Sequence, residues 1–347
     1  MTIPASVLTE FSNQCLAKAG VPPDEAVLIT RTLLEADARG IPSHGLMRLP
    51  LYVSRIRKGL NRAASRIETV GDHASTALLD AHYSAGQIAA ARAMDLAIAK
   101  AGEHGVGAVA VRNSNHFGIA AHYALKAAEK GMIGLAASNT TPLMPPTGGA
   151  EKILGNNPLA IAAPSANPFP LLLDMALSNA ALGKILHAKM TGAPIPEGWG
   201  TDKSGKPTTD PVAVLDGGFM LPVGGAKGFG LAFMIELLTG VLGGVQFSRM
   251  IPSMYDLTQR QSIAHFLLVI DVARFIEIRR FKALAAQLSA YVKNAARAEG
   301  VEELYLPGEI EFQKEKERMA SGIPIDDKVL GELRELAESL EVPALNL

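Results

Sequence analysis

Three residues that could carry out acid–base chemistry on an anion lie in the segment GIPSHGLMR, residues 40–48. Ser43 and His44 are adjacent, and Arg48 follows the histidine by four positions. Adjacent residues are poorly placed as nucleophile and base, because the imidazole would have to fold back onto its neighbour's hydroxyl. We therefore predict that His44 donates a proton, Ser43 supports it, and Arg48 clamps a carboxylate. The alternative is structural, with Ser43 capping a helix and the other two side chains solvated.

Three further segments are suited to an anionic ligand. NSNHFG, residues 113–118, joins a predicted strand to a predicted helix, where free N–H groups favour phosphate. Its His116 could add a proton donor, although a plain helix cap explains the segment equally well. In GGAKGFG, residues 224–230, Lys227 opens an apolar helix, an unfavourable place for a cation unless an anion binds there. The turn Pro307–Glu309 presents a carboxylate that could hold a ribose hydroxyl.

Other common signatures are absent or out of context. Gly105–Ala110 fits a permissive dinucleotide fingerprint, but it follows a helix and runs into a strand, the reverse of what that fingerprint requires. The sequence contains no P-loop, no HExxH, and no histidine–carboxylate spacing that indicates a metal site. We therefore predict no resident metal.

The composition narrows the class of protein. The chain has 347 residues, of which 48% are hydrophobic and 19% charged, and its net charge is −1. These values indicate a globular protein without a basic surface for nucleic acid or an anionic membrane. Cys15 is the only cysteine, and the N-terminus does not look like a signal peptide, so we expect a cytoplasmic protein. Residues 228–245 are apolar enough to resemble a membrane span, but Glu236 and the glycines favour a buried helix.

The elements that must position these side chains follow from periodicity and capping. Helices are expected over residues 21–39 and 48–58, so GIPSHG joins two helices. From residue 75 onward, predicted strands near 75–82, 107–113, 132–139, 158–164, 170–177 and 265–272 alternate with predicted helices. This alternation indicates an α/β fold. We predict a helical domain from residues 1–74 and 300–347 beside an α/β domain over residues 75–299.

Several motifs lie in a set order: GIPSHGLMRLPLYVSRIRKG, VRNSNHFGIAAHYA, KILGNNPLAIAAP, LLLDMALS, IPEGWGTDKSGKPTTDP, LPVGGAKGFGLA, PGEIE and SGIPI. The ordered set resembles the type-2 malate/L-lactate dehydrogenase family over nearly the whole chain. The resemblance implies a non-Rossmann mixed-sheet nucleotide-binding domain, NAD or NADP as cofactor, a small-molecule substrate and a homodimer.

By the same resemblance, Ser43 and His44 would be the catalytic pair and Arg48 the substrate anchor. In some members the histidine at the position of His116 is the acid–base, so the two histidines compete. Two departures concern the substrate side: Asn156 stands in GNNP where the family has GTNP, and Lys184 lies where imine-reducing members carry an aspartate. The implied cofactor contacts are His116, Phe117, Gly118, Ile119, Ala120, Thr140, Asp174, Met175, Ala176, Gly224, Gly225, Lys227, Pro307, Gly308 and Glu309.

The sequence thus predicts hydride transfer between NAD(P)H and a small 2-oxo acid, giving the 2-hydroxy acid. One alternative is reduction of a cyclic imine carboxylate such as piperideine-2-carboxylate. A second is a nucleotide-binding protein that keeps the fold without catalysis. Malate, lactate, ureidoglycolate, sulfolactate and sugar acids are the candidate substrates that the resemblance leaves open.

Overall fold

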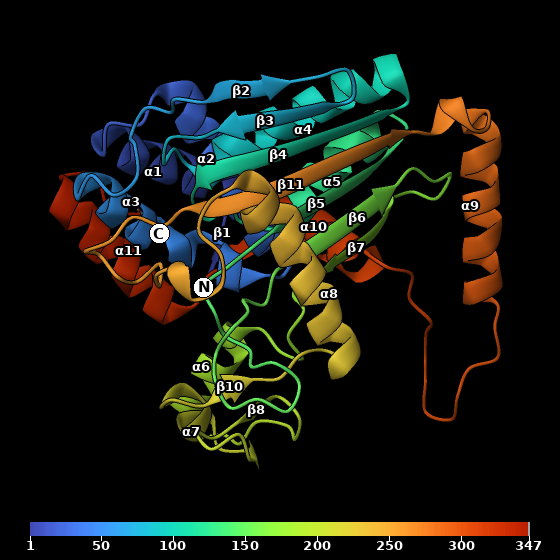
Figure 1. The fold of residues 1–347 in the computed structure, drawn as a ribbon. Helices are drawn as coiled ribbons and strands as arrows, with labels where there is room; N and C mark the ends of the chain where they lie inside the picture. The colour runs from blue at the N-terminus through green and yellow to red at the C-terminus, as the bar shows by residue number, and fades with distance from the viewer. Residues whose placement is uncertain (346–347) are drawn as a thin grey trace.

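A seven-stranded mixed sheet forms the centre of the computed structural model, which describes residues 1–345 (Figure 1). β3 and β4 pair in parallel, and the other neighbours pair antiparallel. In spatial order the strands are β2 (Glu68–Asp72), β3 (Thr76–Asp80), β4 (Val106–Ser114), β11 (Ile263–Asp271), β5 (Met132–Ser138), β6 (Leu159–Ala163) and β7 (Leu171–Met175). The late strand β11 therefore lies in the middle of the sheet and ties its two halves together.

Two helices cover one face of this sheet. α4 (Gly86–His104) packs on β4 and β11, and α5 (Ala121–Glu129) packs on β5 and β6 (Figure 1). Gly105 ends α4 with φ +88°, and a Cβ on Gly107 would meet the carbonyl oxygen of Ala97 at 2.0 Å. The glycines of the fingerprint-like stretch thus serve helix termination and close helix–strand packing, as its context in the sequence indicated.

The two ends of the chain build a helical part at one end of the sheet. α1 (Ala5–Lys18), α2 (Pro23–Ala38) and α3 (Leu49–Arg57) share a buried apolar core with α11 (Asp327–Leu340), while α10 (Glu309–Ser321) lies against α2. The short strands β1 (Thr2–Ile3) and β12 (Ile323–Pro324) pair with each other. Residues more than 250 positions apart are thereby joined, as in the Arg39–Glu315 ion pair, whose nitrogen and oxygen are 2.7 Å apart.

A small lobe follows β7. It contains α6 (Leu182–Thr191), α7 (Pro211–Leu215) and a three-stranded sheet of β8 (Gly200–Thr201), β9 (Pro207–Thr208) and β10 (Phe219–Met220). α8 (Ala226–Glu236) leads back from the lobe and continues into a π-helical turn at Leu237–Val241. α9 (Ile278–Lys293) lies beyond the end of β11 and contacts the β6–β7 connection, where Asn167 Nδ2 donates to Ser289 Oγ at 2.8 Å (Figure 1).

The structure confirms the predicted α/β class and mixed sheet, with two differences. β2 was not predicted, because four of its five residues are exposed and carry no apolar alternation. α8 was expected to be a buried helix, but within this single chain Leu231, Phe233 and Met234 are exposed by 41%, 48% and 52%. The division into two domains stays a prediction, and β2 begins before its boundary at residue 75 and pairs with β3. No helix within residues 1–345 is long and apolar enough to span a membrane.

Candidate active site

A cleft of about 310 Å³ lies where the helical part meets the ends of β5 and β7 and the start of α5. It brings together candidates that are far apart in the sequence, from the loop after α2, the β4–α5 connection and the two strand ends. The predicted residues that line it are Ser43, His44, Arg48, His116, Phe117, Gly118, Ile119, Ala120, Thr140, Asn156, Asp174, Met175 and Ala176.

The loop that carries Ser43 and His44 is held from below by Asp37. Two short 3-10 turns, Pro42–His44 and Leu46–Arg48, form the loop. The Asp37 carboxylate accepts a hydrogen bond from the Leu46 N–H at 2.7 Å. A Cβ on Gly45 would lie 2.0 Å from Asp37 Oδ1, so only glycine allows this close approach. The loop is therefore fixed to α2, and Ser43 Oγ lies 2.9 Å from His44 Nδ1.

Arg48 is the positively charged side chain in the wall of the cleft. Its Nε donates to the Ser43 carbonyl at 2.6 Å, and its Nη1 donates to the Tyr255 hydroxyl at 2.5 Å. Within the described residues these groups and a long contact to Met254 sulfur account for its hydrogen bonds. The second terminal nitrogen, Nη2, can therefore donate to an anion.

His44 and His116 form a stacked pair, with ring centroids 5.3 Å apart and planes inclined by 26°. Burial and the neighbouring Arg48 guanidinium lower the pKa of His44 to about 4. Burial, followed by the charges of His44 and Arg48, holds the pKa of His116 well below its usual value. Because a charge on His44 disfavours protonation of His116, the two stacked rings should not both be protonated.

The far wall of the cleft supplies polar groups at the strand ends. Asp174 accepts a hydrogen bond from the Ala121 N–H at the start of α5, at 3.1 Å. Burial raises the pKa of Asp174 to about 6, although that hydrogen bond opposes the shift. Thr140 Oγ1 donates to Asn156 Oδ1 at 3.0 Å on the neighbouring segment. The Asp174 carboxylate at the start of α5 can accept hydrogen bonds from ligand hydroxyls, and the hydroxyl and amide groups nearby can donate to a ligand.

Other predicted residues lie outside the wall of the cleft. Lys184 is exposed, and its ammonium lies 5.8 Å from the centre of the Trp199 ring. Gly224, Gly225 and Lys227 are exposed at the start of α8. The residues just before them bond to those just after Ala176, with Val223 N donating to Leu177 O at 2.9 Å, so this turn borders the same strand end.

The predicted turn Pro307–Gly308–Glu309 packs on β7. The Pro307 carbonyl accepts a hydrogen bond from Leu172 N at 3.1 Å, and a Cβ on Gly308 would meet Leu172 at 2.8 Å. Glu309 is buried, and its carboxylate accepts hydrogen bonds from Leu306 N at 2.8 Å and from Lys293 Nζ at 2.9 Å. The carboxylate predicted to hold a ribose hydroxyl thus already binds two groups of its own chain.

Sequence reasoning missed two aromatic side chains of the site. Tyr52 hydroxyl lies 2.6 Å from His116 Nδ1, and its position one helical turn after Arg48 was a usable signal. Tyr255 comes from the connection between α8 and β11, 207 residues beyond Arg48, and nothing local marks it. Also missed in the wall of the cleft were Ile41, Ser138, Asn139, Thr141, Leu143, Pro158, Ala181, Leu182, Gly183, Ser253, Met254, Gln261 and Ile263.

Comparisons with known proteins agree with this fold. The family model described as "Malate/L-lactate dehydrogenase" matches residues 3–334, and the chain belongs to that family. It is 40% identical to malate dehydrogenase from Pyrococcus horikoshii over 350 residues, covering 99% of this chain and 96% of that protein. It is 37% identical to an NAD(+)-dependent ureidoglycolate dehydrogenase from Escherichia coli over 332 residues, covering 95% and 94% of the two chains.

A solved structure gives the same answer for the fold. Sulfolactate dehydrogenase from Methanocaldococcus jannaschii superposes with a TM-score of 0.93 at 38% identity, over 99% of this chain and 98% of that one. The predicted family membership is therefore confirmed. Relatives in the family are named as NAD(+)- or NADP(+)-dependent dehydrogenases. No group of three or more potential metal-ligating side chains occurs in the part of the chain that the structure describes.

Proposed function

We propose that the cleft catalyses reversible hydride transfer between NAD(P)H and a small 2-oxo acid. The chain is an oxidoreductase of the malate/L-lactate dehydrogenase family, acting on hydroxy acids with NAD or NADP. One observation carries the assignment of roles: the Arg48 guanidinium and both imidazoles line the same cleft as Asp174 at the strand end. A carboxylate clamp, a proton donor and a cofactor wall thus lie within one small space.

Each side chain has a defined task in this proposal. The nicotinamide ring, when bound, supplies the hydride for reduction or accepts it in oxidation. Arg48 holds the substrate carboxylate through its uncommitted nitrogen, which orients the carbonyl carbon. His44, beside this clamp, delivers the proton to the carbonyl oxygen, and Ser43 fixes its ring through Nδ1. His116, stacked on His44, shares the proton of the pair.

The remaining predicted contacts belong to the same proposal. Asp174, Met175 and Ala176, the segment His116–Ala120 and Thr140 would line the bound cofactor. The turn at Gly224–Lys227 borders the end of β7, whereas Pro307–Glu309 packs beside Leu172 near its start, and both would contact the cofactor from outside the cleft. Asn156 faces the substrate side, whereas the Trp199 contact of Lys184 favours a structural role for that lysine.

Replacement of either histidine tests the assignment. His44→Ala should lower kcat for oxo acid reduction by about 10²–10⁴-fold while leaving the Kd of NAD(P)H nearly unchanged. His116→Ala should also lower kcat, because the pair shares one proton. Full activity of His44→Ala alongside an inactive His116→Ala would transfer the donor role to His116. A panel of 2-oxo acids and piperideine-2-carboxylate, each with NADH and NADPH, identifies the substrate and tests the imine alternative.

We also propose that the protein is a homodimer. Apolar side chains are exposed along α8 and the π-helical turn after it: Leu231, Phe233, Met234, Val241 and Leu242. An exposed apolar stripe of this kind supports burial against another copy. The measurement is mass by light scattering during size-exclusion chromatography, for the wild type and for Phe233→Glu. A monomeric wild type would contradict the proposal.

We further propose a cytoplasmic location. Its support is the single cysteine, Cys15, which is buried and unpaired as expected in a reducing compartment. Cell fractionation with an antibody against the chain is the test, and recovery outside the cytoplasm would contradict it.

A further inference from the structure

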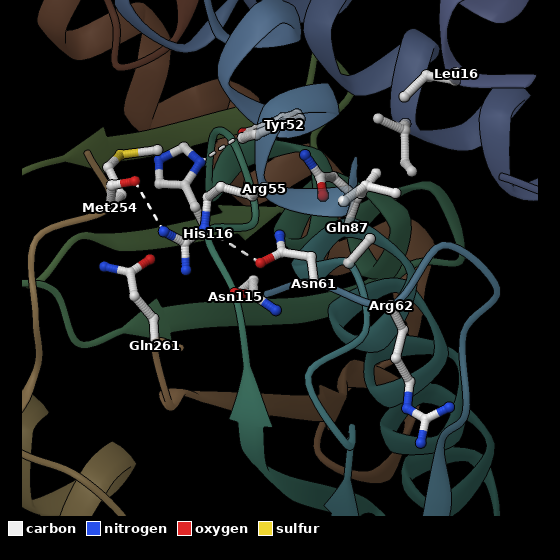
Figure 2. A pocket seen from close by; sticks show the side chains of 13 residues that line it. Leu16, Tyr52, Arg55, Asn61, Arg62, Gln87, Asn115, His116, Met254 and Gln261 are labelled. Carbon is white, nitrogen blue, oxygen red and sulfur yellow. Dashed lines mark hydrogen bonds between the residues drawn. The ribbon is translucent and has the colours of Figure 1, made fainter. Parts of the chain in front are cut away.

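A second, much smaller cavity lies directly behind His116. Its volume is about 20 Å³, and its wall includes residues of α1, α2, α3, the start of α4 and the segment after β4, together with Met254 and Gln261 (Figure 2). Tyr52, Arg55, Gln87, Asn115 and His116 are among the side chains that line it. His116, Met254 and Gln261 line both this cavity and the catalytic cleft, so these three side chains separate the two spaces.

Two buried polar atoms in the wall of this cavity are unpartnered. Gln87 and Asn115 are exposed by only 2% and 3%, yet Gln87 Nε2 and Asn115 Oδ1 have no hydrogen-bond partner within residues 1–345. A buried donor or acceptor left unpaired costs about 1–3 kcal/mol. Both side chains line this cavity, and its volume of about 20 Å³ exceeds the roughly 10–15 Å³ that one water needs.

Other polar groups in the wall are already satisfied. Arg55 donates to the carbonyls of Met254 and Asp256 at 3.0 Å each, and to Asn61 Oδ1 at 3.2 Å (Figure 2). The fixed charge of Arg55 also disfavours a resident hydronium ion in the cavity. A water here would therefore be neutral, and its hydrogen bonds would go to Gln87, Asn115 and their neighbours.

Tyr52 connects this cavity to the catalytic pair. Its hydroxyl lies 2.6 Å from His116 Nδ1, and the Gln87 amide is close enough to influence the phenol, whose pKa is raised by burial and partly restored by Arg48 and Gln87. On the opposite side the cavity is closed by Arg62, an exposed residue. A path from solvent to the site of reaction therefore passes Arg62, the cavity, Tyr52 and His116 before it reaches the cleft.

We propose that this cavity holds one water that relays protons between solvent and the His44–His116 pair, through Tyr52. The inference rests on the proposed function, because reduction of a 2-oxo acid consumes one proton per turnover. The cavity gives the pair a route to solvent that does not pass through the cleft in which cofactor and substrate would bind. Gln87 and Asn115 hold the water, and Tyr52 carries the proton.

The transfer balances without a charged intermediate at Tyr52. The water gives a proton to the Tyr52 oxygen while the Tyr52 O–H proton moves to His116 Nδ1. The imidazole of His116 releases a proton from its other nitrogen into the cleft, where it recharges His44. The hydroxide left in the cavity takes a proton from solvent past Arg62. After this transfer the His116 imidazole carries its proton on Nδ1. Rotation of that ring, or proton transfer in the opposite direction during oxidation, restores the original tautomer.

The test uses variants that keep shape and remove hydrogen bonds. Tyr52→Phe deletes the phenol oxygen, and Gln87→Met replaces the amide by a side chain of similar length. Gln287→Met makes the same chemical change on the exposed face of α9 and serves as control. In the first two, kcat for reduction should fall about tenfold or more, with unchanged KM for NAD(P)H. The solvent deuterium isotope effect on kcat should rise, and imidazole buffer should restore part of the rate.

The possible results distinguish a proton relay from a purely structural hydrogen-bond network. A fall in kcat with no change in isotope effect and no rescue by buffer would mean a structural network and would overturn the relay. Unchanged kinetics in both variants would overturn it as well. Thermal unfolding of each variant identifies loss through misfolding, and a crystal structure of the wild type should contain a water bonded to Gln87 Nε2 and Asn115 Oδ1. Absence of turnover in the wild type would instead contradict the proposed function.

Discussion

Arg48 and Tyr255 are joined by a hydrogen bond of 2.5 Å, although 207 residues separate them in the chain. The tyrosine lies on the connection between α8 and β11, and the arginine lies at the start of α3. The guanidinium also stands over the Tyr255 ring, with its central carbon 5.8 Å from the ring centroid. The connection before β11 therefore fixes the direction in which the carboxylate clamp points.

Tyr255→Phe tests this relationship, because it removes the hydroxyl and keeps the ring. A hydrogen bond to a charged group contributes about 1.5–3 kcal/mol, so KM for the oxo acid should rise by about tenfold or more, with a smaller change in kcat. Steady-state kinetics with saturating NAD(P)H gives both constants. Tyr291→Phe on the exposed face of α9 is the matched control. An unchanged KM would mean that Arg48 is oriented by Ser43 alone.

The low pKa values of His44 and His116 predict how the rates of reduction and of oxidation depend on pH. Since burial and Arg48 lower the pKa of His44 to about 4, the rings are neutral at pH 7. A neutral base favours oxidation, so kcat/KM for the hydroxy acid should stay level from neutral pH to about pH 5 and fall near pH 4. For reduction, kcat/KM should rise as pH falls, about tenfold per unit, until the same region.

Removal of the Arg48 charge should move this titration. In Arg48→Gln the pKa of His44 should rise, because the neighbouring positive charge that opposes protonation is gone. NMR titration of labelled histidine in the free protein measures the shift without requiring turnover. If the His44 resonance titrated at the same pH in both proteins, burial alone would account for its low pKa.

Features that depend on the local spacing of residues could be predicted from the sequence. Ser43, His44 and Arg48 lie within one short loop, so their types and order predicted a common site, and the structure places all of them in the cleft. The central strands followed from apolar runs, and the mixed sheet followed from the family resemblance. Asp174, Met175 and Ala176 also depended on that resemblance, because a strand end carries no chemical signature of its own.

Long-range pairing explains what was missed. Tyr255 reaches Arg48 only because β11 inserts between β4 and β5, a placement that no local pattern encodes. The sequence predicted a buried helix at α8, but one face of it is exposed in this chain. An apolar helix has the same sequence pattern whether its own chain or a second protein chain covers it. Glu309 was assigned a ribose hydroxyl, but the sequence does not reveal that Lys293 reaches it from α9.

Asp174→Asn tests the cofactor wall. The carboxylate accepts the Ala121 N–H at 3.1 Å and is held at the start of α5, where it can accept a ribose hydroxyl. The amide keeps the shape and loses the charge-assisted hydrogen bond, so Kd for NAD(P)H should rise by about tenfold. Fluorescence titration with NADH and NADPH measures it. Asp95→Asn on the exposed face of α4 should leave Kd unchanged, and an unaltered Kd in Asp174→Asn would place the ribose elsewhere.

The buried carboxyl of Asp37, beneath the loop that carries Ser43 and His44, should make the stability of the protein depend on pH. Burial raises its pKa to about 7, against the Leu46 N–H and Arg318, which favour the charged form. Since the folded pKa lies above the unfolded one, this group's contribution to stability is complete below about pH 4 and is lost as pH rises through about 7. Asp37→Asn still accepts the Leu46 N–H and has no such titration.

The free energies of unfolding of Asp37→Asn and wild type should therefore diverge with pH. Between pH 5 and pH 8 the variant should gain about 2–3 kcal/mol relative to wild type, since each pKa unit corresponds to about 1.4 kcal/mol. Urea denaturation at the two pH values measures the difference. Asp95→Asn, which changes an exposed carboxylate, should run parallel to wild type. A constant difference between Asp37→Asn and wild type would mean that Arg318 keeps Asp37 ionised throughout, and that the loop bearing His44 is held by a charged rather than a neutral acceptor.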